Sequence, residues 1–235
     1  MASMDKLSIQ EALSYGWNTF KSRPWIFVQA GVLLFLINLA INLLQTVFEE
    51  GSRMGGDQIA FLAVVLSTLL GMAVSFLISM GETSFFLRAH DAVKEVTVRD
   101  LWHPEGFLRF AGASLLAGIA IVAGFILLIV PGIILSILFM FVGYLVIEKG
   151  RGPIEALKES AEMTKGNRLQ LFLFGLALIG INLLGMLALF VGLLVTIPVS
   201  FLATVHLYRT LSGKEGTDEA SAGLSEEQST ELAAA

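Results

Sequence analysis

One uncharged stretch of the chain decides its fold. Residues 110–147 read FAGASLLAGIAIVAGFILLIVPGIILSILFMFVGYLVI, nearly 40 positions without a formal charge. A helix needs about 20 apolar residues to cross roughly 30 Å of hydrocarbon, so this stretch holds two spans. Proline and glycine interrupt helices, and we therefore predict the turn between the two spans at Val130-Pro131-Gly132.

Three further stretches without formal charge, His aside, extend this pattern along the chain. Residues 24–48 and 58–81 hold one span each, and residues 169–208 hold two, with a turn between Gly185 and Gly192. Pro198 is expected to kink or break the last helix because it lacks a backbone N–H. The sequence thus predicts an all-α membrane protein with six spans in three hairpins, at residues 25–46, 59–81, 110–130, 132–148, 169–187 and 190–209.

The composition agrees with this class and excludes several kinds of site. Hydrophobic residues make up 55% of the chain, and charged residues make up 15%, against about 25% in soluble domains. The absence of cysteine excludes disulfides, thiol chemistry and cysteine-ligated metals. Three histidines leave little material for a metal centre, and we expect no cofactor, no metal and no nucleic-acid partner.

The basic residues predict the orientation. Of the 15 Lys and Arg residues, only Arg53 falls on the side of the membrane opposite the termini. By the positive-inside rule, the termini and the long loops are then cytoplasmic. Residues 212–235 carry six acidic side chains against Lys214 and lack apolar periodicity, which predicts a disordered cytoplasmic tail. The net charge of −5 therefore belongs to this tail and not to the membrane body.

A segment of mixed polarity precedes each hairpin. Ile9, Leu13, Trp17 and Phe20 recur at helical spacing among polar residues, which predicts an amphipathic helix lying in the membrane interface. A second such helix is expected from Gly152-Pro153 to about Gly166-Asn167, and a shorter one at 97–102.

The first and last of these segments align with each other. Glu11-Ala12-Leu13 matches Glu155-Ala156-Leu157, and in the same register Lys21 falls on Lys165. Two interpretations remain: a repeat of helix plus hairpin, or the amphipathic helices that any multispan protein carries before its hairpins.

Two sets of polar residues are candidates for a site. The first is a polar face or cavity lining made of Asn38, Asn42, Gln45, Thr196 and Ser200. The second is an interfacial charged cluster of Glu82, Glu148, His206 and Arg209, in which Arg88, Lys149 or Arg151 is expected to pair with the two glutamates. For the first set, hydrogen bonding between helices is favoured over a cavity; for the second, interfacial anchoring is favoured over a shallow pocket.

Four segments resemble a known family. Pro131-Gly132-Ile133-Ile134 and residues 141–148, 152–160 and 164–168 are similar to the membrane domain of glycerophosphodiester phosphodiesterases and to related uncharacterised bacterial six-helix membrane proteins. The resemblance implies a multi-pass protein of a prokaryotic cytoplasmic (inner) membrane, linked to lipid or envelope processes. In fused members of that family the catalytic residues belong to a separate soluble barrel, so the resemblance transfers no catalytic residue.

These observations rank three functional hypotheses. The first is a non-catalytic scaffold or accessory protein, whose partners are membrane lipids, another membrane protein or a second copy of the chain. The second is a transporter or lipid-handling protein with a cavity between the hairpins. The third and weakest is a lipid-headgroup enzyme using Glu82, Glu148 and His206, because no nucleotide-binding, serine-hydrolase or metalloprotease motif occurs. A solvated cavity that reaches Asn38 or Asn42 would contradict the scaffold hypothesis, whereas dry, close-packed spans would contradict the transporter hypothesis.

Overall fold

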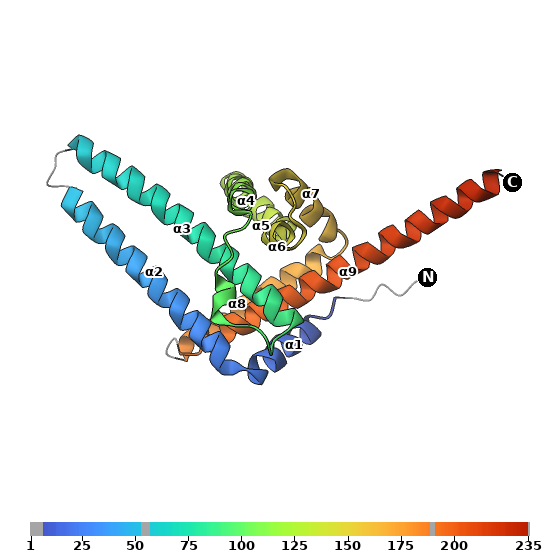
Figure 1. Ribbon diagram of the computed structural model, residues 1–235, viewed down its shortest axis with the longest axis horizontal. Helices are drawn as coiled ribbons and strands as arrows, with labels where there is room; N and C mark the ends of the chain where they lie inside the picture. Colours follow the sequence, from blue (N-terminus) through green and yellow to red (C-terminus); the bar gives the residue numbers. More distant parts are fainter. Residues whose placement is uncertain (1–6, 53–56, 189–190, 235) are drawn as a thin grey trace.

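The computed structural model describes residues 7–52, 57–188 and 191–234, and every regular element in these ranges is a helix (Figure 1). This confirms the predicted all-α fold. Lys6 and Arg53 lie outside the described residues. The elements in chain order are α1 (Ile9–Ser22), α2 (Pro24–Ser52), α3 (Asp57–Asp91), the 3-10 helix η2 (Val98–Leu101), α4 (Phe107–Leu127), α5 (Ile129–Leu138), α6 (Val142–Lys149), α7 (Pro153–Met163), α8 (Arg168–Leu187) and α9 (Leu193–Ala234).

Six helical segments are long and apolar enough to cross a membrane, as the sequence predicts. They are Pro24–Phe48, Phe61–Asp91, Phe107–Leu127, Ile129–Lys149, Arg168–Leu187 and Leu193–Gly213. Consecutive segments contact each other, α2 with α3, α4 with α5, and α8 with α9. The fourth segment consists of α5 and α6 and is interrupted at residues 139–141.

The turn in the third apolar stretch lies three residues before the expected Pro131-Gly132. Leu128 is extended, with φ −166° and ψ 158°, and it separates α4 from α5. Pro131 falls in the first turn of α5, where its missing N–H removes no helical hydrogen bond. Gly132 instead lets the two helices approach, because a Cβ there would collide with the Phe125 ring of α4.

Pro198 does not break the last helix. Helix α9 runs through it and continues through the acidic residues to Ala234, where we expected a segment without regular structure. Alanine and glutamate have high helix propensity, and the segment is rich in both, which accounts for the continued helix. The expected disorder of this tail in solution stays a prediction.

The buried core lies where α3, α6 and α9 meet. Its largest fully buried side chains include Phe85 of α3, Phe141 beside α6, and Leu202 and Tyr208 of α9. The middle and C-terminal part of α2 contributes little to this core, since the apolar side chains from Val32 to Phe48 are largely exposed. In Figure 1 the α2–α3 pair extends away from the other helices.

The structure supports the repeat interpretation for two of the three units. The first residues of α1 and α7, Ile9 and Pro153, are 144 positions apart, and so are the first residues of α2 and α8, Pro24 and Arg168. The same offset superposes Ile37-Asn38-Leu39 on Ile181-Asn182-Leu183. We call α1–α2 the first unit and α7–α8 the third unit.

Helix α1 runs alongside α9 (Figure 1) and buries a different face from the stripe seen in the sequence. Ala12, Gly16 and Phe20 are its buried residues, whereas Trp17 is exposed. A Cβ on Gly16 would lie 2.5 Å from the carbonyl oxygen of Val199. The small residues thus permit a close backbone approach, and the predicted interfacial location of α1 remains untested.

Candidate functional site

A groove between α2, α3 and α9 contains two of the predicted polar residues. Its volume is about 550 Å³, and among its lining residues only Asn38 and Glu82 carry polar side chains. We call it the Glu82 groove. Its other lining residues are Phe27, Ala30, Gly31, Val32, Leu34, Phe35, Phe85, Phe86, Val191, Leu193, Leu194, Ile197, Pro198 and Phe201.

Stacked aromatic rings form part of the wall around Glu82. The rings of Phe86 and Phe201 lie parallel with centroids 4.7 Å apart, and Phe27 stacks on Phe86 at 6.2 Å. Asn38 Nδ2 donates a hydrogen bond to the Leu34 carbonyl oxygen at 3.0 Å. Glu82 follows Gly81, whose lack of a side chain lets the backbone of Leu101 lie against α3. The groove therefore combines an apolar wall with one amide and one carboxyl group.

The predicted partners of Glu82 are bound elsewhere. Arg88 pairs with Asp100 at 2.5 Å, while Lys149 and Arg151 both pair with Glu159 at 2.6 Å. Within residues 7–52, 57–188 and 191–234, the half-buried Glu82 carboxylate has neither a hydrogen bond nor a cationic partner. The expected pairing is wrong because these cations have carboxylates closer to them on η2 and α7.

The remaining polar-face residues do not join Asn38 in one cavity. Asn42 donates to the Asn38 carbonyl oxygen at 2.7 Å, and Gln45 donates across to the Ser67 carbonyl oxygen of α3 at 3.4 Å. Ser200 accepts from Asn182 Nδ2 at 2.9 Å and donates to the Thr196 carbonyl oxygen at 2.7 Å. Most of the set therefore bonds within and between helices. Asn182 did not stand out in the sequence, although its 144-residue offset from Asn38 is a signal that identifies it.

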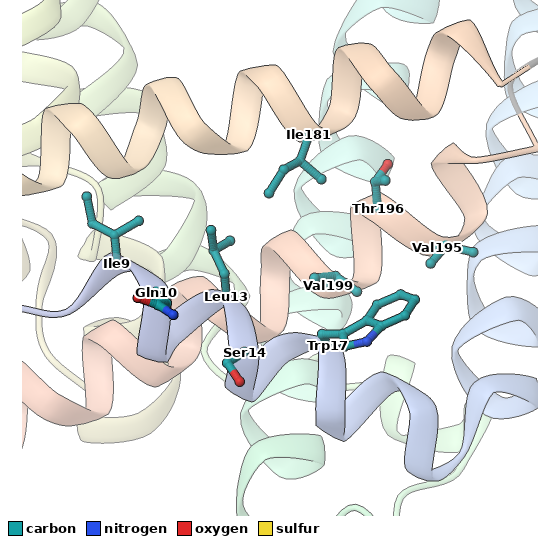
Figure 2. Close-up of a pocket in the computed structure, with 9 residues that line it drawn as sticks. All are labelled: Ile9, Gln10, Leu13, Ser14, Trp17, Ile181, Val195, Thr196 and Val199. Carbon is teal, nitrogen blue, oxygen red and sulfur yellow. The ribbon is translucent and has the colours of Figure 1, made fainter.

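A second groove lies between α1, α8 and α9 (Figure 2). Its volume is about 650 Å³, and Thr196 lines it together with Gln10 and Ser14 of α1. Thr196 Oγ1 is buried without a hydrogen-bond partner. The other lining residues are Ile9, Leu13, Trp17, Ile181, Val195 and Val199. This groove contains no ionisable side chain, so it offers apolar contact and hydroxyl or amide hydrogen bonds only.

The charged cluster assembles in part. Arg209 pairs with Glu148, as well as with Asp91 at 2.5 Å. His206 Nδ1 lies 3.4 Å from His90 Nε2, and His90 Nδ1 lies 3.2 Å from Asp91. Glu82 is not part of this network. The charged groups of the network bind one another, which is the arrangement expected of a structural ion-pair network.

Tyr15 joins the cluster from α1. Its hydroxyl donates to the His90 carbonyl oxygen at 2.9 Å, and its ring stacks on His206 with centroids 4.4 Å apart. Burial raises the pKa of the Tyr15 phenol, so the hydroxyl stays protonated and remains a donor. No local sequence pattern indicates this contact, because Tyr15 and His90 are 75 positions apart.

Comparisons with known proteins point to uncharacterised families. A family model described as "Protein of unknown function (DUF975)" matches residues 108–215. Over 228 residues, the chain is 26% identical to an uncharacterized protein of Mycobacterium bovis and to uncharacterized proteins from two strains of Mycobacterium tuberculosis. Each alignment covers 88% of this chain and 69% of the relative. No solved structure matches the chain.

These similarities sharpen the resemblance found in the sequence. The relatives are uncharacterised bacterial proteins, as part of that resemblance implies. None of the matches supports the glycerophosphodiester phosphodiesterase membrane-domain name. The function must therefore be argued from the grooves themselves.

Proposed function

We propose that this protein is a non-catalytic, multi-pass membrane protein that holds a lipid-sized amphiphile in the Glu82 groove. The observation that carries the proposal is the lining of this groove, which is apolar except for Asn38 and Glu82. Sites for small molecules are typically concave, about 300–1,000 Å³ in volume and apolar, with a few polar groups that orient the ligand. A groove of about 550 Å³ with this lining fits that description.

The groove favours a lipid-handling protein over a pure scaffold. A pure scaffold needs no cavity that reaches Asn38, whereas a lipid-handling protein does. Among the described lining residues Glu82 is the only ionisable side chain, so acid–base chemistry there would have to use this one carboxyl group as both proton donor and acceptor. Glu148 and His206, the other residues of the enzyme hypothesis, belong to the Arg209 network. Binding without catalysis is therefore the favoured function.

Blocking the groove tests the proposal. Gly31 lines it, and the nearest atom to a Cβ there is Leu194 Cδ2 at 3.9 Å, so Gly31→Leu fills the space toward α9. Gly180 of α8 has nothing within 4 Å of its Cβ position, which makes Gly180→Leu the matched control. Native mass spectrometry should show bound lipid on the wild-type protein and on Gly180→Leu, with clear loss on Gly31→Leu. Equal lipid retention by both variants would exclude the groove as the site.

We also propose that the protein lies in a prokaryotic inner membrane with both termini in the cytoplasm. The charge asymmetry supports this orientation, and the chain lacks cysteine, so single cysteines report topology cleanly. In intact spheroplasts, an impermeant maleimide should label Gly51→Cys, in the last turn of α2, but label Glu95→Cys, between α3 and η2, only after lysis. Labelling of Glu95→Cys from outside would reverse the orientation.

A scaffold role remains the second candidate because of the α2–α3 pair. Large apolar side chains are exposed along both helices, among them Phe35, Leu44, Phe61 and Leu70. A membrane partner or a second copy of the chain would cover such faces, and so would lipid. The same mass spectra measure oligomeric state: a stable dimer or a copurified membrane protein supports the scaffold, and a monomer opposes self-association.

A further inference from the structure

We infer that the polar end of the bound amphiphile is a cation of the alkylammonium type, which pairs with the Glu82 carboxylate. This inference rests on the proposed function, and it concerns only the chemical class of the ligand. Three features of the Glu82 groove point to this class: a carboxylate without an ion pair among the described residues, the hydrogen-bonding state of Asn38 and the aromatic wall.

Among the described residues, no Lys, Arg or His forms an ion pair with Glu82. Arg23, at the junction of α1 and α2, donates to the carbonyl oxygens of Val93, Lys94 and Val96 at 2.8–3.1 Å. Arg88 and Arg209 each pair with other carboxylates. A carboxylate in apolar surroundings is unfavourable unless a charge or hydrogen bonds compensate it. A cationic ligand would supply that compensation.

Both polar groups of the groove present hydrogen-bond acceptors. Asn38 Nδ2 donates one of its two N–H groups to the Leu34 carbonyl oxygen, so its side-chain oxygen remains available as an acceptor beside one remaining N–H. Glu82 offers only acceptors when ionised. The matching ligand group is therefore a hydrogen-bond donor with positive charge, and a phosphate or carboxylate alone would be repelled.

The aromatic wall favours the same chemistry. Phe85 and Phe86 lie within one turn of Glu82 on α3, and Phe27 and Phe201 complete the wall from α2 and α9. Phe27, Phe85 and Phe86 are buried, so a cation in the groove would meet the more exposed rings of Phe35 and Phe201. Aromatic faces attract ammonium groups through their quadrupole. The alkyl chain of the amphiphile then occupies the apolar remainder of the groove, formed by residues such as Leu34 and Leu194.

Competition between ligands of equal chain length tests the inference. The purified full-length protein is incubated with hexadecylamine, hexadecanol and palmitate, and the bound fraction is read by native mass spectrometry. We expect wild type to prefer the amine over the alcohol by about tenfold, since a charge-assisted hydrogen bond is stronger than a neutral one, and to bind palmitate least. Equal binding of amine and alcohol by wild type overturns the inference without any variant.

Two variants separate the inference from the function on which it rests. Glu82→Gln should lose the preference for the amine over the alcohol, because it removes the negative charge that pairs with the ammonium group. Gly31→Leu should lose both ligands. If Glu82→Gln keeps the amine preference, the cation assignment is wrong while the groove still binds amphiphiles. If Gly31→Leu binds every ligand as wild type does, the proposed function itself is wrong. Melting curves of both variants confirm that each is folded.

A second measurement identifies the source of the ammonium group. The protein is incubated in mixed micelles with equal amounts of phosphatidylethanolamine and phosphatidylglycerol. Preferential retention of phosphatidylethanolamine supports a membrane lipid as the ligand. Preference for hexadecylamine without preference between the two lipids supports a single-chain cationic amphiphile instead. Preference for phosphatidylglycerol contradicts the inference.

Discussion

The first and third units begin at equivalent positions, yet they pack on different neighbours. Helix α1 packs on α9, whereas α7 packs on α4 and α6. Gly16 of α1 and Ser160 of α7 occupy equivalent positions, and each contacts the backbone of a spanning segment. Gly16 lies against the Val199 carbonyl oxygen beside Pro198. Ser160 Oγ bonds the Phe141 amide and the Leu138 carbonyl oxygen at the break between α5 and α6.

The middles of α2 and α8 differ in a similar way. Asn182 of α8 donates to Ser200 of α9 at 2.9 Å, which joins two helices. The equivalent Asn38 of α2 bonds only its own helix and faces the Glu82 groove. Asn38 and Asn182 are therefore equivalent in sequence, but Asn182 forms a contact between helices whereas Asn38 faces a groove.

The largest expected effect comes from the Gly16 contact. Gly16→Leu should lower the free energy of unfolding by about 3 kcal/mol, since overpacking a close backbone contact forces the helices apart. This change is measured by titrating the purified protein with a denaturing detergent and monitoring helix content by circular dichroism. Gly180→Leu is the control and should change stability little. Equal effects of the two substitutions would mean that α1 is not packed on α9.

Ser160→Ala tests the equivalent position of the third unit. Ser160 is fully buried, and its loss leaves the Phe141 amide and the Leu138 carbonyl without a side-chain partner. We expect destabilisation by about 2 kcal/mol, measured in the same titration. Ser79→Ala, at an exposed position of α3, should be nearly neutral. A neutral Ser160→Ala would show that the break in the fourth span does not depend on α7.

The two asparagines test the difference between closed and open helix pairs. Asn182→Leu should cost about 0.6–1.7 kcal/mol, the range for hydrogen bonds between membrane helices. Asn38→Leu should leave stability nearly unchanged but reduce retention of hexadecylamine, because it removes an acceptor from the Glu82 groove. If Asn38→Leu destabilises as much as Asn182→Leu, then α2 is packed as closely as α8.

The smallest expected effects come from Tyr15 and Glu159, again an equivalent pair. Tyr15→Phe keeps the ring stack on His206 and removes one hydrogen bond, at a cost of about 1 kcal/mol. Glu159→Gln weakens two partly exposed ion pairs and should cost about 0.5 kcal/mol. High salt should abolish only the second effect. If the loss of stability caused by Tyr15→Phe also depended on salt, the Tyr15 hydroxyl would belong to the ion-pair network instead.

The spans were predictable because they depend on local composition. Uncharged runs of sufficient length indicate membrane helices wherever they pack, and the six segments agree with this expectation. In the third apolar stretch, the turn lies before its predicted position because Pro131 is compatible with the first turn of a helix as well as with a loop. Phe20 belongs to the predicted apolar stripe of α1 and is buried, but the burial of Ala12 and Gly16 depends on α9 and could not be read from α1 alone.

The candidate site was predictable only as separate residues. Asn38 and Glu82 were each singled out, but in different sets, because they belong to different helices and are 44 positions apart in the sequence. The Tyr15, His90 and His206 contacts were missed for the same reason. Such proximity depends on how helices pack, and side-chain patterns within one helix do not report it.

By itself, the amino-acid sequence determined the helical class, the six spans and the 144-residue register, because hydrophobic length and periodicity are properties of neighbouring residues. Only the tertiary structure decided which neighbours each unit packs on, that within the described residues Glu82 lacks a cation while Glu148 has one, and that Asn38 faces a groove while the equivalent Asn182 bonds Ser200 of α9. These features depend on contacts between distant segments, since the attraction between two charges or two helix faces exists only once folding brings them together.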